Sequence, residues 1–527
     1  MSKYIDAPTL KAWLSDGGEL ALLDVRELGQ YGLSHPFFAI PLAYSRLELR
    51  LRALVPSQST RIAVYDDGAG VAEKAAARAE AMGYENIHVL EGGAPAWERG
   101  GYTLYSGVNV PSKSFGELIE HDLGTPRIPA EELKAMQDAS EDFVLVDGRP
   151  FAEYTRFNIP GGICCPNGEL SLRIKQLAPD PRTKIVVNCA GRTRSIIGAQ
   201  TLIDLGVPNE VVALENGTQG WLLSGFKLEY GASRLYPDLP DDAEMSVPRE
   251  RAREVAEARG VKYVDAGQLG SWLGEKDRTT YVFDVRTQEE FNADGAPGSV
   301  HAPGGQLVQA TDQWVGVRNA RLVIADSDGL RAAMVANWLR QLGHEAYVLE
   351  SGVTGLAGMG LPKSASGPEF AALEIISAVE AKALTDKGAV QLVDIRGSMT
   401  YREGHIDGAV WSIRPRINAA ALGNVSVLLV ADCPGIAALA ATDLSEAGLE
   451  VTGLLDGGPD DWKAAGFEIV ETPNVPADAD CIDYLFLTPE RNQGNLDDAR
   501  AYLAWEVGLV DQLDEQERGV FAIVPAP

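Results

Sequence analysis

Short apolar runs alternate along the chain with stretches of helical length, and one order of such elements occurs four times. Each repeat opens with an apolar run that ends in an Asp-x-Arg turn. Because nearly every position in these runs is apolar, they predict strands that are covered on both faces of a sheet. The runs are LLDVRE (22–27), LVDGRP (145–150), VFDVRT (282–287) and LVDIRG (392–397).

Each repeat continues with a second apolar run that ends in a glycine loop, then an Ala-rich helical stretch, then a third run that ends in Glu/Asp-x-Gly. Strands that alternate with helices predict an α/β domain with a largely parallel sheet. The loop glycines lie 123, 138 and 106 residues apart, which makes each repeat a domain. These glycines are Gly68, Gly191, Gly329 and Gly435.

The predicted organisation is therefore four tandem α/β domains followed by a C-terminal helical extension. Polar or Pro/Gly-rich linkers are expected at 106–117, 236–255 and 363–370. In the extension, aromatic and apolar positions such as Tyr502 and Trp505 are expected to dock on a domain or on another subunit. The predicted domains are 1–108, 122–236, 250–364 and 368–473, with the extension at 474–527.

The chain is acidic, with 46 basic and 75 acidic residues among 527 and a formal charge of −29. Such a surface repels phosphate backbones and anionic lipids, so nucleic acid and membranes are not expected as partners. No apolar stretch has the length of a membrane span, and the start lacks the pattern of a secretory leader. The five scattered cysteines include no Cys-x-x-Cys pair, so we expect a reducing cytoplasm, no metal and no cofactor.

The stretch VVNCAGRTRSIIGA (186–199) places the thiol of Cys189 close to two positively charged arginines. The thiol follows a buried-type strand and precedes a helix, where loop N–H groups favour negative charge. This surrounding is expected to stabilise a thiolate or an anionic adduct, with Gly191 allowing the tight loop and Arg194 closing it. The candidate catalytic residue is Cys189, and the candidate substrate-binding residues are Ala190, Gly191, Arg192, Thr193, Arg194 and Ser195.

The other three loops are expected to be inactive or degenerate. Alignment on the glycines places Asp66 and Ser327 where the second repeat has Cys189, and neither can carry a persulfide. The fourth loop has Cys433 but no following arginine, and Asp432 beside it disfavours a thiolate.

Taken together, these motifs resemble the rhodanese family of sulfurtransferases over about residues 1–473. The Asp-x-Arg turns, the Gly-His-Ile-x-Gly-Ala segment at 404–409, the cysteine loop and the final Glu-x-Gly-x-x-x-Trp turn carry the resemblance. The resemblance implies parallel five-stranded sheets flanked by helices. It also implies ping-pong sulfur transfer, in which Cys189 takes sulfur from thiosulfate and passes it to cyanide or a cellular thiol.

Several side chains have both a functional and a structural interpretation. Glu169 and Arg149 are candidate pocket residues, although Glu169 fits a helix start equally well and Arg149 fits an ion pair with Asp147. Cys164 and Cys165 could form a redox pair but are better explained as packing residues.

Two other functions compete with the sulfurtransferase. One is a persulfide-carrying or partner-binding scaffold, which the inactive loops favour. The other is a cysteine-dependent phosphatase or arsenate reductase, against which the loop length argues: four residues separate Cys189 from Arg194, whereas phosphatases of the cell-cycle type have five. A homodimer is compatible with the extension and the inactive domains.

Overall fold

The computed structural model describes residues 3–239, 244–361, 370, 372–417 and 425–527. It divides into two compact units. The first contains the first and fourth repeats, and the second contains the second and third repeats and most of the C-terminal extension. Within the described residues, no helix is long and apolar enough to cross a membrane.

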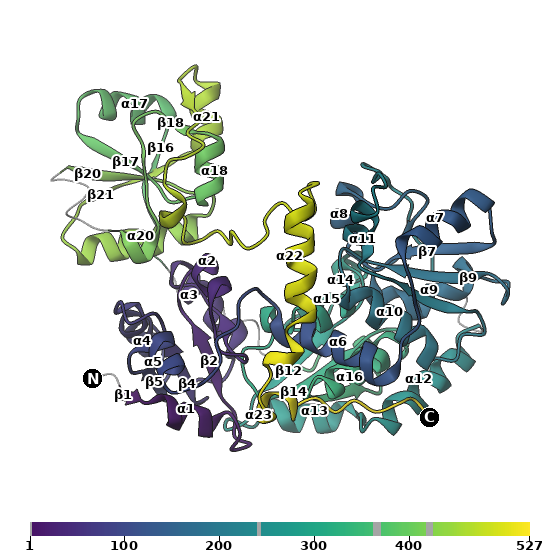
Figure 1. Cartoon of the computed structure of the whole chain (residues 1–527). Helices are drawn as coiled ribbons and strands as arrows, with labels where there is room; N and C mark the ends of the chain where they lie inside the picture. Colours follow the sequence, from purple (N-terminus) through teal and green to yellow (C-terminus); the bar gives the residue numbers. More distant parts are fainter. Residues whose placement is uncertain (1–2, 240–243, 362–369, 371, 418–424) are drawn as a thin grey trace. The chain divides into compact units, whose positions relative to one another are not determined.

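Each repeat folds around a five-stranded sheet with the same strand order and parallel pairing (Figure 1). The four orders are β1-β5-β4-β2-β3, β6-β10-β9-β7-β8, β11-β15-β14-β12-β13 and β16-β21-β20-β17-β19. The predicted fold class is therefore confirmed. The fourth repeat also has an antiparallel pair, β18 (His405–Ile406) with β22 (Ile469–Val470).

The first unit contains the sheets of repeats one and four. The strands of repeat one are β1 Lys3–Ile5, β2 Ala21–Asp24, β3 Ile40–Pro41, β4 Ile62–Tyr65 and β5 Ile87–Leu90, and its helices are α1 Ala7–Trp13, α2 Leu28–Leu33, α3 Leu47–Leu54, α4 Val71–Ala81 and α5 Gly93–Arg99. The strands of repeat four are β16 Ile375–Ile376, β17 Val390–Asp394, β19 Val410–Trp411, β20 Ser426–Val430 and β21 Val451–Leu455, and its helices are α17 Ala378–Asp386, α18 Ser398–Glu403, α20 Pro434–Glu446 and α21 Gly458–Ala464.

The second unit contains the candidate site. The strands of repeat two are β6 Arg127–Ile128, β7 Phe143–Asp147, β8 Ile163–Cys164, β9 Lys184–Asn188 and β10 Val211–Leu214, and its helices are α6 Val110–Leu123, α7 Ala130–Ala139, α8 Phe151–Arg156, α9 Asn167–Leu177, α10 Thr193–Asp204 and α11 Gly217–Leu223. The strands of repeat three are β11 Lys262–Val264, β12 Thr280–Asp284, β13 Val300–His301, β14 Arg321–Ala325 and β15 Glu345–Leu349, and its helices are α12 Ser246–Ala258, α13 Ala266–Leu273, α14 Gln288–Asp294, α15 Gly304–Gln309 and α16 Arg331–Gln341.

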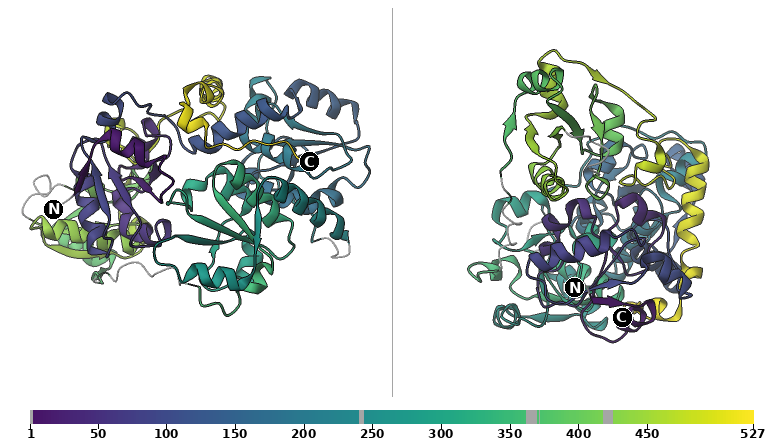
Figure 2. Two further views of the ribbon diagram at one scale, coloured as in Figure 1. Left: turned by 90° about the horizontal axis from the view of Figure 1, so that it is seen from below. Right: turned by 90° about the vertical axis from the view of Figure 1, so that its left-hand side faces the viewer.

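The C-terminal extension contributes α22 (Leu496–Val507) and α23 (Glu515–Arg518), as the sequence predicted. In the second unit α22 packs against α6 and α11 (Figures 1 and 2). The extension therefore docks on a domain of its own chain.

Two of the expected linkers are structured. Residues 106–117 contain the start of α6, and residues 236–255 contain most of α12. Both helices cover neighbouring helices with small or apolar residues, a pattern that the surrounding polar positions hid in the sequence. The third linker, 363–370, and the predicted boundaries at 364 and 368 lie almost wholly outside the described residues.

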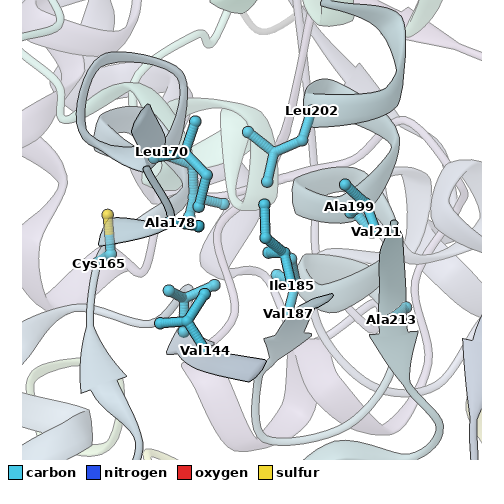
Figure 3. Packing of buried hydrophobic residues seen from close by; sticks show 12 residues of the cluster. Val144, Cys165, Leu170, Ala178, Ile185, Val187, Ala199, Leu202, Val211 and Ala213 are labelled. Carbon is cyan, nitrogen blue, oxygen red and sulfur yellow. The ribbon is translucent and has the colours of Figure 1, made fainter. Parts of the chain in front are cut away.

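The core of repeat two explains why its strands are apolar at nearly every position. Ile185 and Val187 of β9 point to the helix side that carries Leu170 and Leu202 (Figure 3). Val186 faces the opposite layer, in a cluster with Trp221 of α11. Burial on both faces fixes β9, and thereby the position at which its following loop begins.

Each Asp-x-Arg turn is a buried ion pair at the carboxyl end of a central strand. In repeat two, Arg149 Nε and Nη2 donate to the carboxylate of Asp147 at 2.9 and 2.7 Å, and Nη2 also donates to the carbonyl of Phe157. The same geometry occurs in the other three repeats, so the structural interpretation is confirmed for Asp24–Arg26, Asp284–Arg286 and Asp394–Arg396.

Candidate functional site

The loop that contains Cys189 connects β9 to α10 and is held by the first turn of α11. The carbonyl oxygen of Cys189 accepts the N–H of Thr218 at 2.9 Å, and that of Ala190 accepts the N–H of Gln219 at 3.1 Å. Gly217 has φ +53°, and a Cβ there would lie 2.2 Å from the carbonyl oxygen of Cys189. Only glycine fits this approach, so the Glu/Asp-x-Gly motif fixes the loop.

Cys189 is 2% exposed, and its sulfur lies 3.6 Å from the hydroxyl oxygen of Ser195. Ser195 in turn donates to the carbonyl of Arg192 at 2.8 Å. The thiol is therefore buried next to the N-terminal end of α10, with the hydroxyl of Ser195 as a polar neighbour.

Arg194 closes the loop by an ion pair with α8. Its two terminal nitrogens donate to the carboxylate of Glu153 at 2.8 and 2.9 Å. Burial opposes the charged guanidinium, but Glu153 and, to a smaller extent, Cys189 and Asp147 outweigh it and raise the pKa of Arg194. The guanidinium of Arg194 is thus bound to Glu153, and its loop-closing role at Cys189 stays a prediction.

Arg192 was expected to add positive charge for an anionic substrate, and the structure gives its side chain another role. Its guanidinium donates to both carboxylate oxygens of Glu117 at 2.7 and 2.8 Å, and it also binds Glu120. The guanidinium also donates to the side-chain oxygen of a third residue, Asn216, at 3.2 Å. The side chain is thus bound to α6 and its charge is balanced there, so it stabilises the loop from outside.

Thr193 and Gly191 contact the C-terminal extension. The hydroxyl of Thr193 donates to Glu506 at 2.8 Å. Gly191 does not have a left-handed φ, but a Cβ on it would lie 3.1 Å from Glu506 Oε2 and 3.3 Å from Tyr502. Glycine is favoured here by the close approach of α22, and not by loop conformation as the sequence suggested.

Backbone pairing corrects the alignment of the four loops. In every repeat the last strand residue accepts an N–H from the residue after the Asp of the Asp-x-Arg turn: Tyr65 from Val25, Asn188 from Gly148, Ala325 from Val285 and Val430 from Ile395. The positions that correspond to Cys189 are therefore Asp66, Asp326 and Ala431. The alignment that placed Ser327 and Cys433 there was wrong because the loop glycine follows that position by two residues for Gly68 and Gly191, but by three for Gly329 and by four for Gly435.

Two of the corresponding loops are filled by their own carboxylate. Asp66 accepts N–H groups from Gly68, Val71 and Ala72 at 2.8, 2.7 and 3.2 Å. Asp326 accepts those of Gly329 and Ala332, both at 2.8 Å. Burial and the neighbouring Asp328 raise the pKa of Asp326 to about 8, so what the two loops share is a cradle of backbone N–H donors directed at an acidic side chain.

The two candidate pocket residues lie elsewhere. Glu169 is 4% exposed and binds Arg173 and, at 2.8 Å, Arg331 of repeat three. It links the two domains of the second unit and does not face Cys189. Arg149 is fully buried in its ion pair with Asp147. A carboxylate at a helix start cannot be told from a pocket residue without knowing which helix packs against it.

Cys164 and Cys165 are packing residues, as preferred from the sequence. Cys165 belongs to the apolar core of repeat two (Figure 3). Burial raises the pKa of Cys164 to about 12 and that of Cys165 well above the usual range of a thiol. Neither is suited to form a thiolate at neutral pH.

Sequence reasoning missed the residues that surround the loop from outside. They are Lys113, Glu117 and Glu120 of α6 and Tyr502 and Glu506 of α22. The only available signal was the apolar spacing of the extension, which predicted docking but not its location. Within the described residues, no group of three or more His, Cys, Asp or Glu side chains is arranged to hold a metal ion.

Four segments match the model of the rhodanese-like domain: residues 6–99, 129–224, 265–358 and 377–465. The chain belongs to the rhodanese family. Each match covers the last four strands of one sheet and includes its loop, so all four repeats are members even where the thiol is missing.

A crystal structure of a thiosulfate sulfurtransferase from Pseudomonas aeruginosa is similar over the whole of both chains, with 40% identity and a TM-score of 0.91. The chain is also 35% identical over 112 residues to an HTH-type transcriptional regulator of Mycobacterium tuberculosis, where the match covers 48% of the regulator and 21% of this chain. A protein of Bacillus subtilis named "Putative sulfur carrier protein YrkF" is 26% identical over 151 residues, 78% of its length and 26% of this chain.

Proposed function

We propose that this protein is a sulfurtransferase that moves a sulfane sulfur from thiosulfate to a thiophilic acceptor through a persulfide on Cys189. Membership in the rhodanese family and the full-length similarity to a protein named thiosulfate sulfurtransferase support sulfur transfer in general. Among the positions that correspond to one another in the four loops, Cys189 is the one thiol.

The N–H groups that Asp66 and Asp326 accept in the equivalent loops give the proposal its strongest structural support. The donors of Asp66 correspond to the N–H groups of Gly191, Arg194 and Ser195 in repeat two. A loop that directs backbone N–H groups at an aspartate side chain in two repeats has N–H groups at the corresponding positions for a thiolate or a persulfide anion in repeat two.

The reaction then proceeds in two balanced steps. The Cys189 thiolate attacks the outer sulfur of thiosulfate; a new S–S bond forms, the old S–S bond breaks, and its electron pair leaves with sulfite. The product is Cys189–S–S⁻, whose charge lies in the cradle. An acceptor such as cyanide then attacks the outer sulfur, forming thiocyanate and returning the electron pair to the Cys189 thiolate.

A discontinuous assay for thiocyanate tests the proposal on the full chain. With thiosulfate and cyanide, we expect thiocyanate from the wild type and from Cys433→Ser, and none from Cys189→Ser. Cys433 is the matched control because it also lies in a loop at the start of a helix, but two positions beyond the one that corresponds to Cys189. Equal turnover in Cys189→Ser, or hydrolysis of p-nitrophenyl phosphate without thiocyanate, would contradict the proposal.

A persulfide carrier or scaffold is the second candidate. The absence of a thiol at the corresponding position of the three other loops favours it, as does the name of the B. subtilis relative. A carrier would load one sulfur on Cys189 but turn over negligibly with small acceptors, so steady-state rates separate the two. The acceptor in the cell, a cytoplasmic location and a homodimer remain predictions.

A further inference from the structure

Helix α22 of the C-terminal extension forms one wall of the cysteine loop. Tyr502 and Glu506 approach Gly191 so closely that a Cβ there would touch both. Just before the helix, Asn492 accepts a hydrogen bond from Gln219 of α11, at 3.3 Å. A segment about 300 residues from Cys189 in the sequence therefore belongs to its surroundings.

Glu506 brings a buried negative charge to this wall. The residue is 1% exposed, and its Oε1 accepts hydrogen bonds from Lys113 at 3.0 Å and from Thr193 at 2.8 Å. Burial would raise the pKa of Glu506, but Lys113 and Thr193 outweigh it and hold the pKa below its usual range. The side chain is ionised at neutral pH.

The second oxygen of this carboxylate has no partner among the described residues, and it is the one that faces Gly191. A buried carboxylate oxygen without a donor is costly, and it is usually retained where it serves a purpose. Here its charge is aimed at the loop that is to receive an anionic sulfur donor.

Among the described residues, Lys113 offsets part of this charge through an ion pair with Oε1, and the arginines bound at the loop are already paired with other carboxylates. Lys113 is already shared with Glu506 and Tyr502, and Arg192 is bound by Glu117 and Glu120. On the other side of the loop, Arg194 is paired with Glu153. The anion-binding strength of the loop therefore comes mainly from its N–H groups, opposed by the charge of Glu506.

We propose that Glu506 is a specificity-determining residue that favours singly charged sulfur donors over dianionic thiosulfate at Cys189. The proposal rests on the proposed sulfur transfer. A donor with charge −2 is repelled twice as strongly by a fixed carboxylate as a donor with charge −1 at the same place. Methanethiosulfonate is the matched donor, because it replaces one charged oxygen of thiosulfate by a methyl group and transfers the same outer sulfur, leaving as methanesulfinate.

The experiment measures the second-order rate constant for persulfide formation on Cys189 with each donor, in the wild type, Glu506→Gln and Glu506→Asp. Glutamine keeps the shape and an acceptor oxygen but removes the charge. For Glu506→Gln we expect a rise of about 10-fold with thiosulfate and about 3-fold with methanethiosulfonate at low salt, which shrinks as salt screens the charge. Glu506→Asp retains the charge and should keep the wild-type ratio between donors.

Glu517→Gln is the matched control, because Glu517 is a buried carboxylate of the same extension that caps α23 away from the loop. It should leave both rate constants unchanged. A Glu506→Gln variant whose rate constants change by the same factor for both donors, or fall for both, overturns the inference and makes Glu506 a structural residue. If neither donor loads the wild type, the proposed function itself fails, and the inference fails with it.

Discussion

Replacing Cys189 by aspartate would test whether the loop of repeat two is the same anion cradle that holds Asp66 and Asp326. The matched comparison is Cys189→Ala, which leaves the cradle empty. If the loops are equivalent, the new carboxylate should accept the N–H groups that correspond to the donors of Asp66, and the variant should be inactive but more stable around the loop than the alanine variant.

The magnitude follows from the observed contacts. Asp66 accepts three N–H groups and Asp326 accepts two, at 2.7 to 3.2 Å. A hydrogen bond to a charged group contributes about 1.5–3 kcal/mol, and burying the carboxylate costs several kcal/mol. A net gain of about 2 kcal/mol over Cys189→Ala corresponds to about 30-fold slower local exchange of amide hydrogens.

Hydrogen exchange followed by mass spectrometry on peptides that cover 186–199 is the suitable assay, since it resolves one loop within a chain of several domains. Cys165→Asp is the control, because Cys165 lies in the apolar core and a carboxylate there should sharply reduce protection. Lower protection in Cys189→Asp than in Cys189→Ala would refute the equivalence of the loops, and with it the argument that the loop stabilises a thiolate.

Three further predictions follow from single contacts. Gly191→Ala should lower the free energy of unfolding of the second unit by about 1 kcal/mol in calorimetry, because its Cβ meets side chains at 3.1 and 3.3 Å. Gly217→Ala should lower it by more than about 3 kcal/mol, because its Cβ meets a carbonyl oxygen at 2.2 Å. Equal costs of the two variants would contradict this prediction. Glu290 of α14 forms an ion pair with Arg331 at 2.7 Å, which outweighs burial and lowers the pKa of Glu290 to about 2. Its stabilisation is full above the unfolded pKa of about 4.3 and is lost as pH falls through about 2. Glu290→Gln should therefore flatten the fall in stability over that range, and an unchanged slope would count against the ion pair. Iodoacetamide at neutral pH should label the half-exposed Cys433 and leave Cys165 unlabelled by peptide mapping, and the reverse order would contradict their burial.

The fold could be predicted from the sequence because it is encoded in local patterns. The apolar runs, the Asp-x-Arg turns and the glycine that begins α11 each fix one strand end or one turn, and they recur in all four repeats. The candidate thiol and arginine could be proposed for the same reason, since Cys189 and Arg194 lie in one short stretch.

The surroundings of the loop could not be predicted, because they depend on packing between distant segments. The same formal charge on Arg192 and Arg194 gave no sign that one binds α6 and the other α8. Likewise, the sequence does not distinguish Gly329, which has a left-handed φ, from Gly191, which makes room for α22. Aligning the loops on glycine shifted two of the four positions, because the glycine lies farther from the strand end in repeats three and four.

Intact-mass spectrometry after treatment with thiosulfate tests the central claim most directly, because it detects the persulfide itself. The account predicts a gain of one sulfur atom in the wild type and in Cys433→Ser, reversed by cyanide, and no gain in Cys189→Ser. An unchanged mass in the wild type, or a sulfur retained in Cys189→Ser, would contradict it.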